Sequence, residues 1–423
     1  MKTFLEKLNV AFRDKVLRKR IAFTIGALVL FRLLATIPIP GVDVASLAKL
    51  LDSSQFFGFL NIFSGGGVSN LSIVMLGVGP FITGSIVIQL LTMIFPKWKA
   101  LLQDEGEAGR NKLSNYSRLL GAPLAVLQAI GFILLLKSQN VLPHLNPFSL
   151  TVNVIVVSAG SILLMWIGEL ISEFGIGNGV SLIIFAGIVS RLPNDFMQFI
   201  AGYDAANMPM YIAAVVVGLV VIAGVVFITE AERSVPVTYA KQVRGNKVYG
   251  GASTYLPLRL NQAGVIPIIF ALSILLFPQI ISNSLSHVSN AVIASYATSF
   301  TVFFNNPIVY GASYFILVVL FTYFYTAVTF DPKQISENLQ RSGAFIPGVR
   351  PGDHTRDYLG NIVTRITLFG ALFLGIIAVL PLAMQAFTSN KSLAIGGTAL
   401  LIVVSVVLDL LKKVDAQVSM REY

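Results

Sequence analysis

Long apolar segments alternate with short polar ones along almost the whole chain. An α-helix rises about 1.5 Å per residue, so crossing about 30 Å of lipid hydrocarbon takes roughly 17–25 apolar residues. The pattern therefore predicts ten transmembrane helices, of which the fifth is short and is expected to begin earlier, near Ile176. The ten segments are residues 21–37, 71–94, 119–136, 152–171, 180–192, 210–228, 263–281, 308–330, 362–384 and 393–411.

The positive residues give these segments a direction across the membrane. With the N-terminus in the cytoplasm, 25 of the 30 Lys and Arg residues fall in cytoplasmic segments, and four fall outside, at Lys49, Lys137, Arg191 and Lys391. Lys and Arg resist translocation, so this bias predicts that both termini are cytoplasmic. Five predicted helices lie on either side of residues 195–209. Two halves with an odd number of helices would have opposite orientations, as inverted repeats do.

Composition agrees with a membrane protein and excludes several kinds of function. Hydrophobic residues make up 55% of the chain and charged residues 12%, whereas soluble domains have about 25% charged residues. The absence of Cys excludes disulfides and thiolate metal sites, and the three His, at 144, 287 and 354, are too far apart in sequence to suggest a metal centre. No serine-hydrolase, zinc-protease or nucleotide-binding motif occurs, so we expect no catalytic residue, no metal and no cofactor.

Glycine and proline interrupt three of the predicted helices. The second contains the run 77–80 (Gly-Val-Gly-Pro), the fifth opens with 175–179 (Gly-Ile-Gly-Asn-Gly), and the seventh opens with 261–267, which includes Gly264 and Pro267. Broken helices at membrane depth are tolerated only where protein or water meets the freed backbone groups. Close packing of helices through small residues explains any one such site equally well, but three sites together favour a cavity or pore.

The loop after the first predicted helix is long and partly apolar. It covers residues 38–70 and contains a Phe-rich segment, 56–63, followed by Ser64 and three glycines. This segment is too short to cross a membrane. It is either an interfacial anchor or a re-entrant segment that folds back into the protein.

Ionisable residues within the predicted helices are few: Arg32, Glu169 and Asp409. A chain of carboxylates would indicate proton coupling, and the sequence has none. A secondary transporter with broken helices and inverted repeats is the alternative to a channel. Such a transporter would need partnered polar groups near the middle of the membrane.

Two predicted cytoplasmic segments are too large to be simple connections. The pattern of residues 229–262 predicts a β-hairpin with its turn at Arg244-Gly245-Asn246, and residues 331–361 are punctuated by Gly and Pro. Both segments are basic. A structured basic loop suits the docking of an acidic partner such as ribosomal RNA, or of a motor protein, while attraction to anionic lipid is the simpler alternative.

Short segments in a fixed order over nearly the whole chain resemble the SecY/Sec61α family of protein-conducting channels. Each segment is weak evidence alone, but together they are specific. The segments are residues 31–32, 37–41, 61–66, 88–91, 105–110, 165–169, 175–179, 184–188, 263–267 and 342–352.

The resemblance implies a fold and a function. The fold is an all-α polytopic membrane protein with ten transmembrane helices, arranged as two pseudo-symmetric five-helix halves, residues 1–194 and 195–423, around an hourglass pore. The function is that of a channel subunit that moves unfolded polypeptides bearing signal sequences across the membrane. The same channel would release transmembrane segments sideways into the bilayer.

The resemblance also implies the residues that would form the channel. From the residues alone, Val78 and Ile82, like Val180 and Ile184, are only expected to share a helix face, because they are four residues apart. The family has a constriction of aliphatic side chains, a plug that would cover residues 56–70, and polar positions at a lateral gate between the second and third helices and the seventh and eighth. The matching residues are Val78, Ile82, Val180, Ile184, Ile269 and Ile402 for the constriction, Phe57, Leu60, Phe63, Gly65 and Gly66 for the plug, and Thr83, Gln128 and Ser273 for the gate.

Partners are implied in the same way. Lys241, Arg244 and Arg350 match positions in the two cytoplasmic loops through which the family contacts the ribosome and the SecA ATPase. The resemblance further implies SecE- and SecG-like small membrane subunits, signal peptides and nascent chains as ligands, surrounding membrane lipids, and a place in the bacterial plasma membrane.

Overall fold

The computed structural model describes residues 14–41, 64, 66–68, 70–95, 97–98, 101, 106–138, 141–142, 146–190, 193, 197, 208–239, 242–244, 247–249, 253–264, 266–285, 291–388 and 391–419. The helices are α2 (Lys15–Leu34), α5 (Gly79–Ile94), α7 (Gly106–Ser138), α8 (Pro147–Phe174), α9 (Gly179–Val189), α11 (Met208–Glu230), α12 (Ile266–Leu285), α13 (Ala291–Asn305), α14 (Pro307–Thr329), α15 (Pro332–Arg341), α16 (Asp353–Thr388) and α17 (Lys391–Ser419). The strands are β1 (Glu232–Tyr239), β2 (Gln242–Arg244), β3 (Lys247–Tyr249), β4 (Ser253–Arg259) and β5 (Ala344–Phe345).

Each of the ten predicted apolar segments overlaps one helix of this structure, so the apolar pattern located the helices correctly. Among the described residues, four helical segments are long and apolar enough to cross a membrane. These four are Asn111–Lys137, Pro147–Phe174, Pro307–Arg341 and Asp353–Leu380. Shorter apolar helical stretches lie in α5, α9, α11 and α12.

The second predicted helix is wrong over its first third, because residues 71–78 form turns and the helix begins only at Gly79. The N–H of Ile39 donates to the carbonyl of Leu71 at 2.8 Å, and that of Ile73 donates to Ile37 at 2.9 Å. Gly77 has a φ of 58°, a left-handed conformation that glycine adopts without a steric penalty. Pro80 in the first turn of the helix costs no hydrogen bond there, so the chain enters α5 through a folded-back stretch.

Two helices were not predicted from the apolar pattern, α13 and α15. The carboxylate of Asp331 caps α15 by accepting from the N–H of Lys333 at 2.9 Å, and Pro332 follows at the first helical position, a typical helix start. Helix α13 has 15 residues and would be about 22 Å long, too short to cross a bilayer.

The predicted β-hairpin is confirmed. Strands β1 and β4 are antiparallel, with Glu232 opposite Arg259, and β2 pairs with β3 so that Arg244 stands opposite Lys247. The short strand β5, which comes from the second basic loop, pairs with β1 and gives the order β4-β1-β5. The two basic loops therefore form one sheet, a long-range pairing that the sequence pattern did not predict.

The sheet rests on the first part of α16. Its inward side chains, which include Val235 and Val237 of β1 and Ala344 of β5, form one buried cluster with Leu359 and Ile362 of α16. Alternation of buried and exposed positions along β1 is what a strand with one covered face requires. The two loops thus form one folded unit that packs against the end of the helix bundle.

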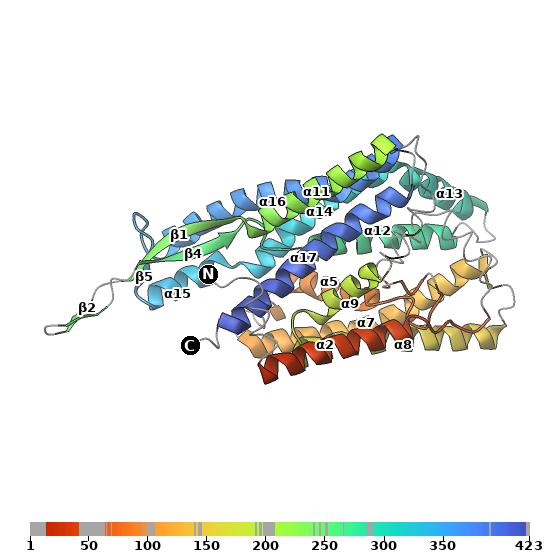
Figure 1. The fold of residues 1–423 in the computed structure, drawn as a ribbon, viewed down its shortest axis with the longest axis horizontal. Coiled ribbons are helices and arrows are strands. Elements are labelled where there is room, and N and C mark those ends of the chain that lie inside the picture. The colour runs from red at the N-terminus through yellow and green to blue at the C-terminus, as the bar shows by residue number, and fades with distance from the viewer. Residues whose placement is uncertain are drawn as a thin grey trace.

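The helices form two groups, with the sheet at one end of the bundle and α13 at the other (Figure 1). Helices α2, α5, α7, α8 and α9 contact one another, as do α11, α12, α14, α16 and α17. The two groups meet where α12 packs on α5 and α7, and where α17 packs on α9. The beginning of α2 and the end of α17 both lie at the end of the bundle that carries the sheet (Figure 1).

Glycines allow the closest helix contacts within the first group. A Cβ at Gly84 of α5 would lie 2.8 Å from the carbonyl oxygen of Ser117 and 3.2 Å from the backbone nitrogen of Gly121, both on α7. A Cβ at Gly179 would collide with the carbonyl oxygen of Gly168 on α8. Small residues at such crossings are the usual device for close packing in membranes. The glycines at the start of α9 therefore serve packing, the simpler of the two explanations that the sequence allowed.

Candidate functional site

An aliphatic junction lies where the two groups of helices meet. Five of the six predicted constriction residues are buried members of a single hydrophobic cluster, and the sixth, Val180, is partly buried and packs against it. Four elements supply them: the start of α5, α9, α12 and α17. We call these six residues the aliphatic junction: Val78, Ile82, Val180, Ile184, Ile269 and Ile402.

Val78 does not sit within a helix, contrary to the expectation that it shares a helix face with Ile82. It is the N-cap residue of α5, and its carbonyl accepts from the N–H of Ile82 at 3.1 Å. This hydrogen bond still holds the two residues one turn apart. Val78 thus lies at the point where turns give way to helix, and Gly77 and Gly79 flank it.

A serine on α8 holds this break in place, and sequence reasoning missed it. The hydroxyl of Ser161 donates to the carbonyl of Gly77 at 2.8 Å, and Ser161 is buried. One helical residue earlier, Gly160 lies so close to the 71–78 stretch that a Cβ there would collide with the carbonyl oxygen of Ile73. The only signal in the sequence was a run of four small residues, 158–161 (Ser-Ala-Gly-Ser), within a largely apolar helix.

The predicted gate residues lie on the helices that meet across the two groups. Thr83 of α5 donates to the carbonyl of Gly79 at 3.0 Å, and Ser273 of α12 donates to that of Ile269 at 2.9 Å. Gln128 on α7 is half-buried. Both hydroxyls therefore bond within their own helix. No side-chain hydrogen bond or ion pair is seen between α12 and α5 or α7 among the described residues, and α12 and α5 contribute apolar side chains to the same buried cluster.

Of the predicted plug residues, Phe57, Leu60, Phe63 and Gly65 lie outside the described residues. Gly66 is described, with a φ of 87°, and a Cβ there would lie 3.4 Å from a guanidinium nitrogen of Arg32 on α2. Ser64, Gly66, Gly67 and Val68 are all buried. The described end of the long loop is therefore buried against the protein, while the Phe-rich segment, 56–63, lies outside the described residues.

Arg350 lies on the exposed turn between β5 and α16. Its carbonyl accepts from the hydroxyl of Thr355 at 2.9 Å, and Ser336 of α15 donates to Gly352 at 2.6 Å. The backbone of this turn is thus held from two sides, and no described carboxylate forms an ion pair with Arg350. Lys241 lies outside the described residues. Arg244 is the last residue of β2, where only its backbone is described.

Two of the three ionisable residues predicted within the apolar helices, Glu169 and Asp409, form ion pairs. Glu169 of α8 forms an ion pair with Arg118 of α7, and Asp409 of α17 pairs with Lys413 one turn later at 2.8 Å. No group of three or more His, Asp or Glu that could hold a metal ion occurs among the residues that the structure describes. This part of the chain offers an apolar junction and no polar site at its centre.

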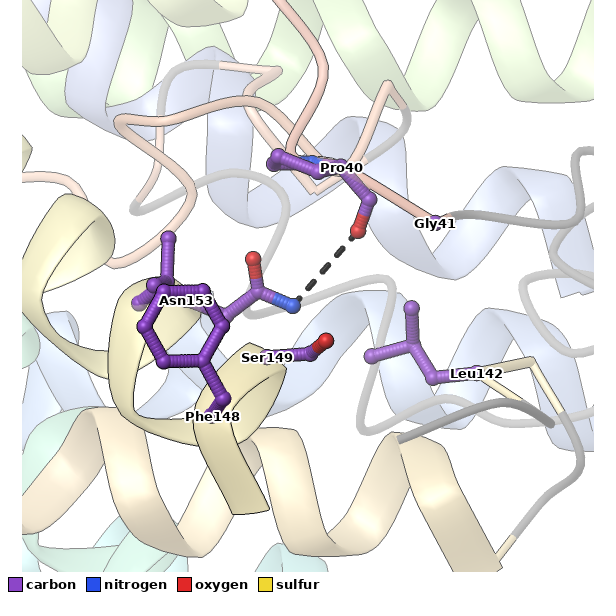
Figure 2. Close-up of a pocket in the computed structure, with 7 residues that line it drawn as sticks. Pro40, Gly41, Leu142, Phe148, Ser149 and Asn153 are labelled. Carbon is purple, nitrogen blue, oxygen red and sulfur yellow. Dashed lines mark hydrogen bonds between the residues drawn. The ribbon is translucent and has the colours of Figure 1, made fainter. Parts of the chain in front are cut away.

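A small cavity lies at the beginning of α8, at the turn that follows α2. It has a volume of about 250 Å³, and Pro40, Leu142, Phe148 and Asn153 are among its lining residues. Figure 2 shows the amide of Asn153 pointing across it to the carbonyl of Pro40, 3.5 Å away. None of its lining residues is ionisable, so the cavity offers no general acid or base that could activate the hydroxyl of Ser149.

Comparison with known proteins identifies the family. The family model described as SecY matches residues 72–411. The chain is 40% identical to the protein translocase subunit SecY of Mycobacterium tuberculosis, over 98% of this chain and 97% of that protein. It is 41% identical to the SecY subunit of Corynebacterium glutamicum over 98% of both chains. The chain belongs to the SecY family.

Solved structures share the SecY fold with this chain. One, described as the structure of a protein conducting channel, matches with a TM-score of 0.66 at 18% identity, over 98% of this chain and 97% of that one. Sec61 in the canine ribosome-channel complex matches with a TM-score of 0.63 at 17% identity, over 98% and 97%. The SecY family membership and the long apolar helices make this chain a multi-pass membrane protein.

Proposed function

We propose that this chain is the pore-forming subunit of a protein-conducting channel in the bacterial plasma membrane. It moves unfolded polypeptides with signal sequences across the membrane and releases transmembrane segments into the bilayer. The aliphatic junction carries this proposal, because four elements from both groups of helices converge on it. Relatives named as protein translocase subunits and the fold shared with protein-conducting channels support the same function.

The aliphatic junction is the constriction of the pore. A translocating chain has a polar backbone and needs a wet path, whereas ions must be stopped when no chain is present. A narrow apolar ring sheds water and gates in that way. Aliphatic side chains can also rearrange around a passing polypeptide without leaving a buried polar group unpaired, since they have none. The plug, residues 56–70, closes the resting channel.

The interface of α12 with α5 and α7 is the lateral gate. It contains no described hydrogen bond or ion pair between these helices, so its opening breaks only apolar contacts. A signal sequence or transmembrane segment is itself an apolar helix and replaces those contacts as it enters. Segments then pass into the bilayer according to their own hydrophobicity.

The topology of the proposed channel is ten transmembrane helices in two halves, residues 1–194 and 195–423, with both termini in the cytoplasm. Three observations support it. Every predicted apolar segment overlaps a helix, the helix contacts fall mostly within the two groups, and the beginning of α2 and the end of α17 share the end of the bundle that carries the basic sheet (Figure 1).

A partner supplies the energy, because the sequence has no nucleotide-binding motif. We propose that the SecA ATPase and the ribosome dock on the cytoplasmic sheet and on Arg350, and that Lys241 and Arg244 extend this surface along the hairpin. Sec61 has been seen in a ribosome-channel complex, which supports the ribosome as a partner. SecE- and SecG-like subunits complete the channel in the membrane.

A single cysteine tests whether a polypeptide passes through the aliphatic junction. The chain has no native Cys, so Ile82→Cys provides a unique thiol. We expect it to form a disulfide with a cysteine in a secretory protein that is stalled halfway through the membrane. The matched control is Val87→Cys, on the exposed side of the same helix, about 140° around its axis. Val87→Cys should give no disulfide.

Two results would overturn the proposal. The first is the absence of a disulfide at Ile82→Cys when protease protection shows that the stalled substrate is engaged with the membrane. The second is saturable uptake of a small solute, driven by an ion gradient, in vesicles that contain the purified protein. That result would favour the secondary transporter.

Replacing Ile402 with Asn is expected to loosen the closed state. Ile402 is fully buried in the cluster, and an amide left without partners there costs about 1–3 kcal/mol. Because 1.4 kcal/mol is a tenfold change in an equilibrium, we expect roughly tenfold more export of substrates with defective signal sequences, and measurable ion conductance. Ile402→Val is the control and should behave like the native chain. Unchanged conductance and signal stringency in Ile402→Asn would remove Ile402 from the constriction.

A further inference from the structure

Helix α13 has no part in the proposed translocation path, and its surface has an unusual division. Its 15 residues contain no charged side chain. Four apolar side chains spaced at helical intervals are exposed on one arc: Val292 (62%), Tyr296 (75%), Phe300 (43%) and Phe303 (58%). At 100° per residue these four fall within about 80° of the helix circumference. They form what we call the aromatic arc.

A second exposed arc of α13 carries hydroxyl groups. Ser295, Thr298 and Ser299 are exposed beside the aromatic arc, and Val302 is the one apolar residue among them. The hydroxyl of Thr298 bonds back to the carbonyl of Ala294 at 2.7 Å, and that of Ser295 to Val292 at 2.9 Å. Each of these hydroxyls donates its hydrogen to a backbone carbonyl, so its oxygen can still accept a hydrogen bond from water. The helix is therefore amphipathic without being charged.

Contacts with α12 fix the rotation of α13 about its own axis. The hydroxyl of Ser282 on α12 donates to the carbonyl of Ala297 at 2.6 Å, and it lies 2.6 Å from the hydroxyl of Thr301. Phe304 packs against the central hydrophobic cluster, and its ring stacks near Phe300 with centroids 4.7 Å apart. The buried side of α13 is thus determined, and the aromatic arc must point away from the bundle.

The position of α13 places this arc at the edge of the membrane. The helix lies at the end of the bundle opposite the cytoplasmic sheet (Figure 1) and contacts both α12 and α14. Helix α14, which begins at Pro307, is part of a segment long enough to cross a bilayer. Ile308 in its first turn is 80% exposed, so α14 also presents an exposed apolar side chain just after α13 ends.

We propose that α13 is an interfacial helix that lies along the lipid–water boundary of the outer leaflet, with the aromatic arc among the lipids and the hydroxyl arc toward water. Aromatic side chains favour this boundary because their rings are apolar and the Tyr hydroxyl reaches the headgroups. In water the same arc would be an exposed apolar patch, which soluble surfaces avoid. Only the assignment to the outer leaflet rests on the proposed channel topology.

The absence of charge on α13 predicts how it binds lipid. Interfacial helices with Lys or Arg on their polar face are attracted to anionic headgroups, whereas α13 offers only apolar burial and hydroxyl groups. Its depth in the bilayer should therefore be the same in neutral phosphatidylcholine vesicles and in vesicles with added phosphatidylglycerol. This distinguishes α13 from the basic cytoplasmic loops.

The test is a fluorophore depth measurement on the full chain, purified with any subunits that stay bound and reconstituted into vesicles. Tyr296→Cys and Phe303→Cys report on the aromatic arc, and Thr298→Cys is the matched control on the hydroxyl arc. Each single cysteine carries an environment-sensitive label. We expect lipids with a nitroxide near the headgroup to quench the Tyr296 and Phe303 labels at least threefold more than the Thr298 label. Iodide in the water should show the reverse order.

Two outcomes would overturn the inference. Equal and strong iodide quenching at all three positions would show a helix surrounded by water. Quenching of the aromatic arc by neither agent would show that another protein chain covers it. Neither outcome bears on the Ile82→Cys disulfide, so this inference and the proposed function can fail separately.

Discussion

A chain with glutamate in place of Arg350 is expected to lose partner-driven translocation by roughly tenfold or more, while it remains folded in the membrane. If the docked partner buries Arg350 in a hydrogen-bonded charge pair, removing the arginine costs about 2–5 kcal/mol, and every 1.4 kcal/mol is a factor of ten. The fold should survive because the side chain is exposed. The turn is held through the backbone, by Thr355 at 2.9 Å and Ser336 at 2.6 Å.

Two control variants separate docking from general charge effects. Lys333→Glu makes the same change in net charge at an exposed position of α15 and should reduce translocation little. Arg350→Lys keeps the charge but loses the planar guanidinium, so it should recover part of the activity if the partner offers carboxylates or phosphates. The measurement is export of a secretory protein into membrane vesicles. Normal export by Arg350→Glu would contradict the docking role.

Replacing Gly160 with Ala should have the largest effect on stability. The added Cβ would collide with the carbonyl oxygen of Ile73, a backbone atom that cannot rotate away, and overpacking of this kind costs about 1–3 kcal/mol or more. The neighbouring hydrogen bond from Ser161 to Gly77, 2.8 Å long, would be strained as well. Because this contact positions the turn that carries Val78, we expect a lower thermal midpoint in detergent and a leaky closed channel.

Gly218→Ala is the matched control for Gly160→Ala. Gly218 also lies within a long apolar helix, α11, but no atom is within 4 Å of the place its Cβ would occupy. Alanine in a helix interior is favoured over glycine by about 0.5–1 kcal/mol, so this variant should be as stable as the native chain or slightly more so. Equal thermal midpoints for the two variants would show that the α8 contact with residues 71–78 is not tight.

The helices were predictable because a run of about 20 apolar residues in a membrane must satisfy its own backbone hydrogen bonds, and an α-helix does so. The hairpin was predictable because its turn residues and alternation are local signals. The turns at 71–78 were missed because their residues are as apolar as those of the helix that follows. Only Gly77, Gly79 and Pro80 marked the break, and the sequence could not show that Ile37 and Ile39 would provide the hydrogen-bonding partners.

The candidate site was less predictable from the residues themselves. An isoleucine in the aliphatic junction, such as Ile269, has the same chemistry as a core isoleucine such as Ile268 beside it, and both are buried in one cluster. The resemblance to a family, and not periodicity, selected the six positions. The pairing of β5 with β1 joins residues about a hundred positions apart and left no local signal.

The two basic loops form one sheet, and strand β4 of that sheet leads directly toward α12. Strand β4 ends at Arg259 and α12 begins at Ile266, and the described part of the connection, residues 260–264, is held by several contacts. The N–H of Leu260 donates to the carbonyl of Ala231 at 2.9 Å, and Asn261 donates to the carbonyl of Gly264 at 3.2 Å. The carbonyl oxygen of Leu260 lies close to Gly370 of α16, where a Cβ would be only 2.6 Å from it. In the proposed channel, a force that a docked partner applies to the hairpin would pass to the start of α12 through these contacts.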